Sequence, residues 1–159
     1  MSKKLTMTPL GRRDFLRLTA CGATAALLPV LHPAGAMADA ASTEAEIKKL
    51  IGDKKRTDGR ITLELPQIAE NGNTVPIAVE VESPMTDSDY VKAVHLFAEQ
   101  NPNPSVATFR FSPQSGKAWA ATRIRLIKTQ NIIAVAEMSD GSIYSAKAEV
   151  KVTIGGCGG

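Results

Sequence analysis

The segment Tyr144-Ser145-Ala146-Lys147-Ala148-Glu149-Val150-Lys151-Val152-Thr153-Ile154 has the most regular pattern in the chain. Apolar, aromatic or small residues occupy every second position, and polar or charged residues lie between them. Because successive side chains of a strand point to opposite faces of a sheet, the alternation predicts a long strand with one face against a core. We expect this strand to hold the chain rigidly up to Ile154.

Similar strand patterns precede this segment. A period of two begins at Ile61, and the stretch over residues 132–138 is apolar on both faces, as is typical of a central strand. Asn71-Gly72-Asn73 and Ser139-Asp140-Gly141-Ser142 have the composition of turns. Besides the last strand, we expect strands over residues 75–81, 91–97, 106–111, 118–128 and 132–138.

One helix is expected before the strands. Thr43-Glu44-Ala45-Glu46 has the spacing of a capping box, and Ile47, Leu50 and Ile51 follow at helical intervals. This pattern predicts a short amphipathic helix over residues 43–52. With six or seven strands joined by short turns, the chain is predicted to be all-β, an immunoglobulin-like antiparallel β-sandwich with one short N-terminal helix.

The N-terminal segment has the features of an export signal. Arg12 and Arg13 precede Phe15 and Leu16, and an apolar run over residues 18–31 follows. This arrangement resembles a twin-arginine signal, cleaved after Ala36 or Ala38. The run of about 14 residues is too short for the ~20 that span a bilayer. We therefore expect residues 1–38 to be removed and the protein to be periplasmic, with no membrane attachment after processing.

Removal of this segment changes the charge and cysteine counts. Residues 1–38 hold five of the nineteen basic residues and one of the sixteen acidic ones, so the remaining chain has a net charge of about −1. That balance, with no basic stripe, argues against nucleic-acid binding. Of the two cysteines, Cys21 lies in the removed segment and Cys157 remains, so no intramolecular disulfide is expected.

The last five residues stand out chemically. Cys157 lies between two glycine pairs, Gly155-Gly156 and Gly158-Gly159. Glycine visits many backbone conformations, so a flexible arm is predicted over residues 155–159, attached to a β-sandwich carrier domain over residues 39–154. A thiol on such an arm is suited to covalent attachment. No cationic residue is closer in sequence than Lys151, so we expect groups of partner proteins to activate the thiol.

The sequence contains few other residues that could form a catalytic or metal-binding site. His95 is the one histidine left after processing, and its position within an apolar strand favours a hydrogen-bonded structural role. One histidine and one cysteine far apart in sequence do not predict a metal site. We expect no metal, no cofactor and no catalytic activity of the chain's own.

The export signal, the β-rich body and above all the terminal Gly-Gly-Cys-Gly-Gly resemble the SoxY family, the sulfur-carrier subunits of the bacterial thiosulfate-oxidising Sox system. The resemblance implies that Cys157 holds thiosulfate-derived intermediates as covalent adducts. It also implies a heterodimer with a SoxZ-like β-sandwich subunit. The implied transient partners are a SoxAX-type haem cytochrome, a SoxB-type di-manganese hydrolase and, in some systems, a SoxCD-type molybdenum dehydrogenase.

Two other functions are compatible with parts of the sequence. Carriers of the Gly-Gly thiocarboxylate type also end in paired glycines, although they work in the cytoplasm, which the export signal opposes. An exported binding module that forms an intermolecular disulfide through Cys157 is the other alternative. Thiol labelling and intact mass after incubation with a thiosulfate-oxidising extract would separate the three.

Overall fold

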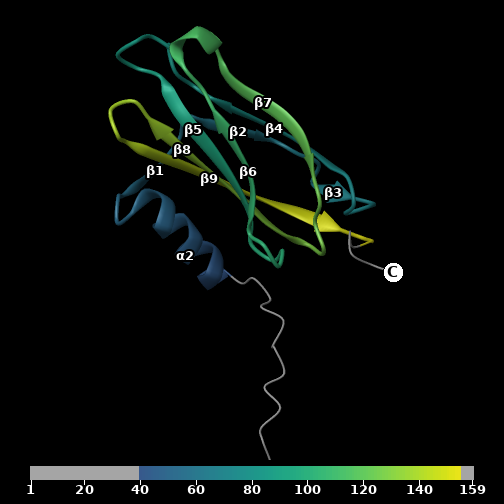
Figure 1. Ribbon diagram of the computed structural model, residues 1–159. Coiled ribbons are helices and arrows are strands. Elements are labelled where there is room, and N and C mark those ends of the chain that lie inside the picture. The colour runs from purple at the N-terminus through teal and green to yellow at the C-terminus, as the bar shows by residue number, and fades with distance from the viewer. Residues whose placement is uncertain (1–39, 155–159) are drawn as a thin grey trace, which may run out of the picture. The chain divides into compact units, whose positions relative to one another are not determined.

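The computed structural model describes residues 40–154, which form two β-sheets and one helix, α2 (Figure 1). The larger sheet has the strand order β1-β9-β8-β5-β6, with β3 also paired to β9. The smaller sheet has the order β2-β4-β7. The predicted all-β class is confirmed, and the two sheets make the sandwich.

The elements follow one another with short connections. Their bounds are α2 (Ala40–Ile51), β1 (Arg56–Asp58), β2 (Ile61–Glu64), β3 (Ile68–Ala69), β4 (Val75–Val81), β5 (Val91–Ala98), β6 (Ser105–Arg110), β7 (Ala118–Ile124), β8 (Gln130–Met138) and β9 (Ile143–Val152). A 3-10 turn, η1 (Pro113–Ser115), lies between β6 and β7.

The main core uses one face of each sheet. Strand β4 alternates between buried apolar residues and more exposed ones, as its period of two predicts. Strand β8 is buried along most of its length because β9 and β5 flank it, which confirms the predicted central position. The fully buried side chains of this core include Val75, Val79, Val91, Val94, Leu96, Leu126, Ile132, Met138 and Val150.

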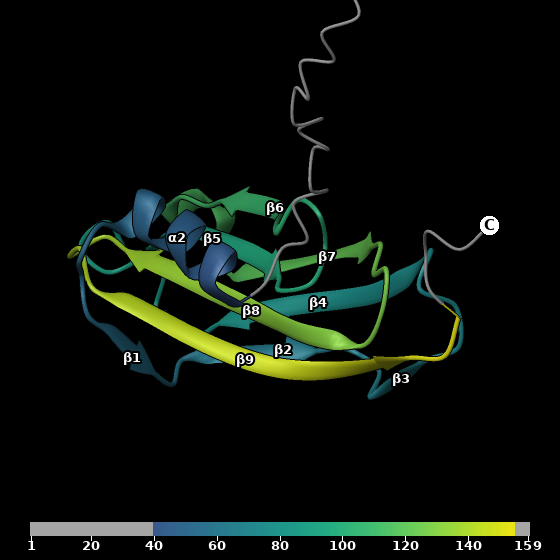
Figure 2. The same cartoon turned by 90° about the horizontal axis from the view of Figure 1, so that it is seen from below.

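Helix α2 covers a second, smaller core on the larger sheet. Ile47 and Ile51 are buried in a cluster with side chains from β5, β8 and β9, namely Phe97, Ile133, Val135 and Ile143. Figure 2 shows α2 lying against these strands from another side. Leu50, which the sequence pattern places with the apolar stripe, is half exposed.

The start of α2 corrects the predicted capping box. The helix begins at Ala40, because Ala40 and Ala41 are good helix formers, and Thr43 therefore lies inside the helix. Thr43, Ile47 and Ile51 are spaced four residues apart and form its buried stripe. The Thr43 hydroxyl is the one buried side-chain polar atom of residues 40–154 that lacks a hydrogen-bond partner.

Two strand predictions need correction. The larger sheet is not purely antiparallel, since the short strands β1 and β3 both run parallel to β9. The strand expected over 118–128 ends at Ile124, and the chain after it is held by Asn101. Its Nδ2 donates to the Arg125 carbonyl over 2.7 Å, and its Oδ1 accepts from the Ile127 amide over 3.2 Å.

Candidate functional site

The residues that the sequence predicts to be functional lie outside the described part of the chain. Cys157 and its four glycines follow the last described residue, and Arg12 and Arg13 precede the first. The structure does describe the point from which residues 155–159 extend. We call Val152, Thr153 and Ile154 the base of the tail.

Hydrogen bonds hold one side of the base against the segment after β3. The Gly72 amide donates to the Ile154 carbonyl over 2.8 Å, and the Thr153 amide donates to the Ala69 carbonyl over 3.1 Å. The Thr153 hydroxyl donates to the Glu70 carbonyl over 2.9 Å. The last two described residues are therefore held mainly through the backbone.

The loop between β7 and β8 holds the other side of the base. The Val152 amide donates to Thr129 Oγ1 over 2.9 Å. The same loop supports Gly72, because the amide of the fully buried Leu126 donates to the Gly72 carbonyl over 2.8 Å. Two loops and the end of β9 thus form one hydrogen-bonded unit.

The sequence predicted that the last strand would hold the chain rigidly up to Ile154, but the base is held by loops instead. Strand β9 ends at Val152, and Ile154 is 66% exposed, so its side chain does not pack into the core. Sequence reasoning missed the partners of the base because, for example, Thr153 and Glu70 lie 83 positions apart. The turn composition of Asn71-Gly72-Asn73 was the available signal, although it named no partner.

Three cationic residues lie next to the base in sequence or on the loop that contacts it. Lys151 precedes it, and Arg125 and Lys128 lie on the loop that contacts it; all three are exposed. None of them forms an ion pair within residues 40–154. An anionic group near the base would meet these three cations and the exposed Glu70, whose carbonyl accepts from Thr153, and the salt of the solution weakens all four charges.

His95 lies away from the base, on the strand β5. The side chain is buried, and both ring nitrogens have partners: Nδ1 lies 3.0 Å from Thr108 Oγ1, and Nε2 lies 2.9 Å from Glu137 Oε1. An imidazole with both nitrogens engaged has none left for proton transfer to a substrate. This arrangement agrees with the predicted structural role.

A buried carboxylate on the larger sheet is paired in the same way. Glu99 is 5% exposed, and it accepts hydrogen bonds of 2.7 Å each from Lys147 Nζ and Asn131 Nδ2. Burial alone would raise the pKa of Glu99, but the hydrogen bonds from Lys147 and Asn131, together with the lysine charge, lower it below its usual value. The carboxylate is thus a structural group, not a free acid or base.

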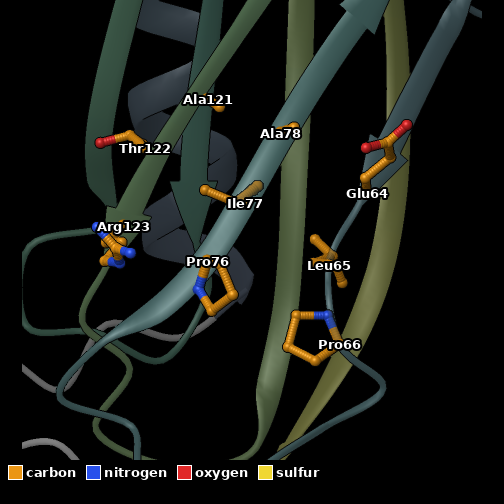
Figure 3. Close-up of a pocket in the computed structure, with 9 residues that line it drawn as sticks. All are labelled: Glu64, Leu65, Pro66, Pro76, Ile77, Ala78, Ala121, Thr122 and Arg123. Carbon is orange, nitrogen blue, oxygen red and sulfur yellow. The ribbon is translucent and has the colours of Figure 1, made fainter.

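A groove of about 830 Å³ crosses the outer face of the smaller sheet (Figure 3). Its lining is formed by residues from the end of β2, the start of β4 and the end of β7, including Leu65, Pro66, Pro76, Ala78, Ala121 and Arg123. The lining contains no histidine, cysteine or serine, and its polar side chains are Glu64, Thr122 and Arg123.

The described residues contain neither a metal-binding cluster nor a membrane-spanning helix. Between residues 40 and 154, no three or more His, Cys, Asp or Glu side chains are grouped so that they could hold a metal ion. No helix in the described part is long and apolar enough to cross a membrane.

Comparison with known proteins identifies similar chains. The family model of the sulfur oxidation protein SoxY matches residues 47–157. The structure of the sulfur carrier protein SoxY from Chlorobium limicola f thiosulfatophilum is 32% identical, with a TM-score of 0.62, and the match covers 73% of this chain and 100% of that one. No match was found among the curated proteins.

Superoxide reductases share the fold. The enzyme from Ignicoccus hospitalis has a TM-score of 0.52 and 17% identity, with 73% of this chain and 94% of that chain covered. The enzyme from Nanoarchaeum equitans has a TM-score of 0.51 and 16% identity, with 61% and 99% covered. At such identities the likeness concerns the arrangement of strands alone.

Proposed function

The chain belongs to the SoxY family of sulfur oxidation proteins, and from this premise we propose that Cys157 is the residue that holds the sulfur cargo. The observation that carries the proposal is the extent of the family match, which runs from residue 47 to Cys157 itself. Cys157 is also the one cysteine outside residues 1–38.

The proposed cargo is thiosulfate-derived. Loading joins the terminal sulfur of thiosulfate to the Cys157 sulfur; the thiol loses its proton, and two electrons pass to a haem cytochrome of the SoxAX type. Hydrolysis by a SoxB-type enzyme then cleaves the bond to the sulfonate group, releases sulfate and leaves a persulfide on Cys157. In systems with a SoxCD-type dehydrogenase, that persulfide is oxidised further.

The surroundings of the base support this role. The tail extends from residues that backbone hydrogen bonds hold in place, so the cargo is tethered to a firm support. Gly155 and Gly156 separate Ile154 from Cys157, so the chain covers three residue steps, a reach of roughly 10 Å when extended. Arg125, Lys128 and Lys151 lack ion-pair partners within residues 40–154, and their charge favours an anionic adduct near the base.

The proposal includes the compartment and the stable partner. Export by the twin-arginine pathway would carry folded protein to the periplasm, and a SoxZ-like subunit without its own signal would cross with this chain. Coexpression of the two subunits, with and without Arg12 and Arg13, tests this. Export of the partner when both arginines are replaced by lysine would contradict it.

The first test concerns the attachment point. Cys157→Ser is expected to abolish adduct formation, because a hydroxyl does not form a disulfide-type bond with thiosulfate, and to leave folding unchanged. Intact-mass spectra after incubation with thiosulfate and the loading cytochrome measure the adduct. His95→Gln is the control, since His95 is buried among Thr108 and Glu137, and it is expected to load like the wild type. A thiosulfate-derived mass on Cys157→Ser would refute the assignment.

The second test concerns the glycines beside the cysteine. Gly156→Val is expected to slow processing by partner enzymes, because a branched side chain adds bulk and stiffness next to the thiol. The free energy of unfolding should stay the same. Thiosulfate-dependent turnover in the reconstituted system measures the effect, and Lys92→Val at an exposed position of β5 is a control for a change outside the tail. Equal rates for Gly156→Val and the wild type would argue against a narrow partner site.

A further inference from the structure

The turn after β3 contains the pair Asn71-Gly72, a sequence open to spontaneous backbone chemistry. The nitrogen of the residue after an asparagine can attack the side-chain amide, and glycine, which has no side chain, hinders that attack least. The other asparagines of the chain precede threonine, isoleucine or proline. Branched side chains crowd the attacking nitrogen, and a proline nitrogen has no proton to lose. Asn71 is therefore the asparagine of this chain best suited to deamidation.

The surroundings of Asn71 favour attack at its side chain. The residue is exposed, and its Oδ1 accepts a hydrogen bond from the Asn73 amide over 2.9 Å. Such a bond holds an asparagine side chain over the backbone of its own turn. The donor also stabilises the negative charge that develops on Oδ1 when Cγ is attacked. The electrophile is thus held in place in the folded protein.

The nucleophile, the Gly72 nitrogen, is restrained by the base of the tail. Figure 2 shows β3, which precedes this turn, beside the end of β9. Gly72 is buried; its amide donates to the Ile154 carbonyl over 2.8 Å, and its carbonyl accepts from the Leu126 amide over 2.8 Å. The amide must break its hydrogen bond before the nitrogen can lose its proton and turn towards the Asn71 side chain.

The base can release this nitrogen at a low cost. The Ile154 side chain is 66% exposed, so hydrogen bonds rather than core packing hold the end of the base. Segments with few buried apolar contacts open locally far more often than the whole fold unfolds. Each such opening frees the Gly72 amide for a short time.

We propose that Asn71-Gly72 is a modification site where the base of the tail controls deamidation. When the base opens, the Gly72 nitrogen loses its proton to water and bonds to Asn71 Cγ; the Cγ–Nδ2 bond breaks, and ammonia leaves. Water then opens the cyclic imide at either carbonyl, which gives aspartate or isoaspartate. These steps need water alone and no change of oxidation state. The site is separate from Cys157 and does not depend on its cargo.

Isoaspartate prevents the base from closing again. Its main chain runs through the former side chain and is longer by one carbon–carbon bond, about 1.5 Å. A displacement of this size breaks the bond between Gly72 and Ile154, because an N–H···O hydrogen bond spans only about 2.7 to 3.2 Å. The new carboxylate also follows the exposed Glu70, a like charge. Deamidation thus makes a reversible opening of the base permanent.

The first measurement is the deamidation rate of the folded chain. The chain carries Cys157→Ser, so that cysteine adducts do not complicate the spectra, and it is kept for several days at mildly alkaline pH. Peptide mapping that separates isoaspartate from aspartate should find the modification at Asn71, at a lower rate than in the urea-unfolded chain. A folded chain that does not react at Asn71, or that reacts there as fast as the unfolded chain, would overturn the proposal.

Variants that loosen the base should speed the reaction. Thr129→Val removes an acceptor, and Thr153→Val removes a donor, of the hydrogen bonds that hold the base. Each should raise the rate in the folded chain by roughly two- to tenfold, the effect of one hydrogen bond. Thr57→Val is the matched control, because Thr57 is exposed and pairs with Tyr144 at the opposite end of β9. Equal acceleration by Thr57→Val, or none by either base variant, would also refute control by the base.

The isolated isoaspartate form tests the consequence for the base. Its Thr153 amide, which bonds Ala69 in the unmodified chain, should exchange with deuterium roughly tenfold faster. Freshly purified Asn71→Asp adds the charge without the extra backbone carbon, and it should exchange like the unmodified chain. Unchanged exchange in the isoaspartate form, or equal acceleration in Asn71→Asp, would contradict release by the longer backbone. No readout involves thiosulfate or Cys157, so failure here leaves the proposed cargo function intact.

Discussion

At the scale of single residues, the polar groups buried on the larger sheet are paired. Glu99, nearly buried, is held by Lys147 and Asn131, and His95 is held by Thr108 and Glu137. A buried charge left with no partner would destabilise the fold, so each partner stabilises the fold chiefly by avoiding that cost. Within residues 40–154, none of these side chains forms a hydrogen bond with the base of the tail, so the structural ionisable residues are separate from the proposed cargo residue.

The pairing of Glu99 gives a pH-dependent prediction. Its folded-state pKa lies below the usual 4.5, so the ionised pair stabilises the fold above that pH and is lost as pH falls through the folded pKa. Lys147→Met should therefore lower the free energy of unfolding by about 1 kcal/mol at pH 7, a modest loss because Lys147 is half exposed and water screens its charge. The difference from the wild type should shrink towards pH 3.

Urea unfolding at a series of pH values measures this effect. Lys151→Met is the matched control, because Lys151 lies on the same face of β9 and forms no ion pair within residues 40–154. It should change stability by less than about 0.5 kcal/mol at every pH. The interpretation is wrong if Lys147→Met costs as much at pH 3 as at pH 7.

At the scale of elements, β9 organises the larger sheet. It pairs with β8 along eight positions and takes β1 and β3 in parallel at its other edge. Helix α2 then covers the outer face through Ile47 and Ile51. Burial of this one stripe attaches the helix, because the remainder of its surface is exposed or charged.

The contribution of α2 can be measured with a pair of substitutions. Ile47 is 1% exposed, so Ile47→Ala should lower the free energy of unfolding by about 2 to 4 kcal/mol through lost burial and the cavity left behind. Leu50→Ala removes a similar side chain from the same helix, but Leu50 is 50% exposed and the cost should stay below about 1 kcal/mol. Chemical unfolding measures the free energy lost by each variant. Equal losses for Ile47→Ala and Leu50→Ala would mean that α2 does not dock through Ile47.

At the scale of the whole molecule, the described body and the tail have different proposed roles. The body supplies stability and surfaces, while the proposed chemistry belongs to Cys157, the central one of the last five residues, the other four of which are glycine. The base of the tail joins the two: it accepts a hydrogen bond from Gly72 and donates to Ala69 and Thr129. A carrier of this kind needs a firm support and a reachable thiol rather than a catalytic cleft.

Reachability of the thiol gives the prediction at this scale. In the native protein, Cys157 should react with a maleimide at a rate within roughly threefold of that in the urea-unfolded chain, because flanking glycines place no side chain in the way. The rate should rise with pH as the thiolate forms, around the ordinary cysteine pKa of about 8.5. Single-cysteine labelling followed by mass spectrometry measures both. A native thiol that resists labelling in every oligomeric state would remove the basis of the carrier proposal.

Much of the fold could be predicted from the chain alone. The alternation in β4 and β9, the apolar run of β8 and the helical spacing of Ile47 and Ile51 each reflect a local pattern that one face of an element imposes on its own sequence. The sandwich followed from the number of such strands and the turns between them. The cargo residue was likewise indicated locally, by a lone cysteine between glycine pairs, and it stays a prediction because it lies outside the described residues.

Tertiary structure decided what local patterns do not encode. The parallel pairing of β1 and β3 with β9 involves segments of three and two residues, too short to show a period. The hydrogen bonds at the base of the tail depend on which distant segments become neighbours. The local sequence pattern determines which face of an element a residue lies on. The residue's partner across a sheet or loop depends on how all the elements pack together.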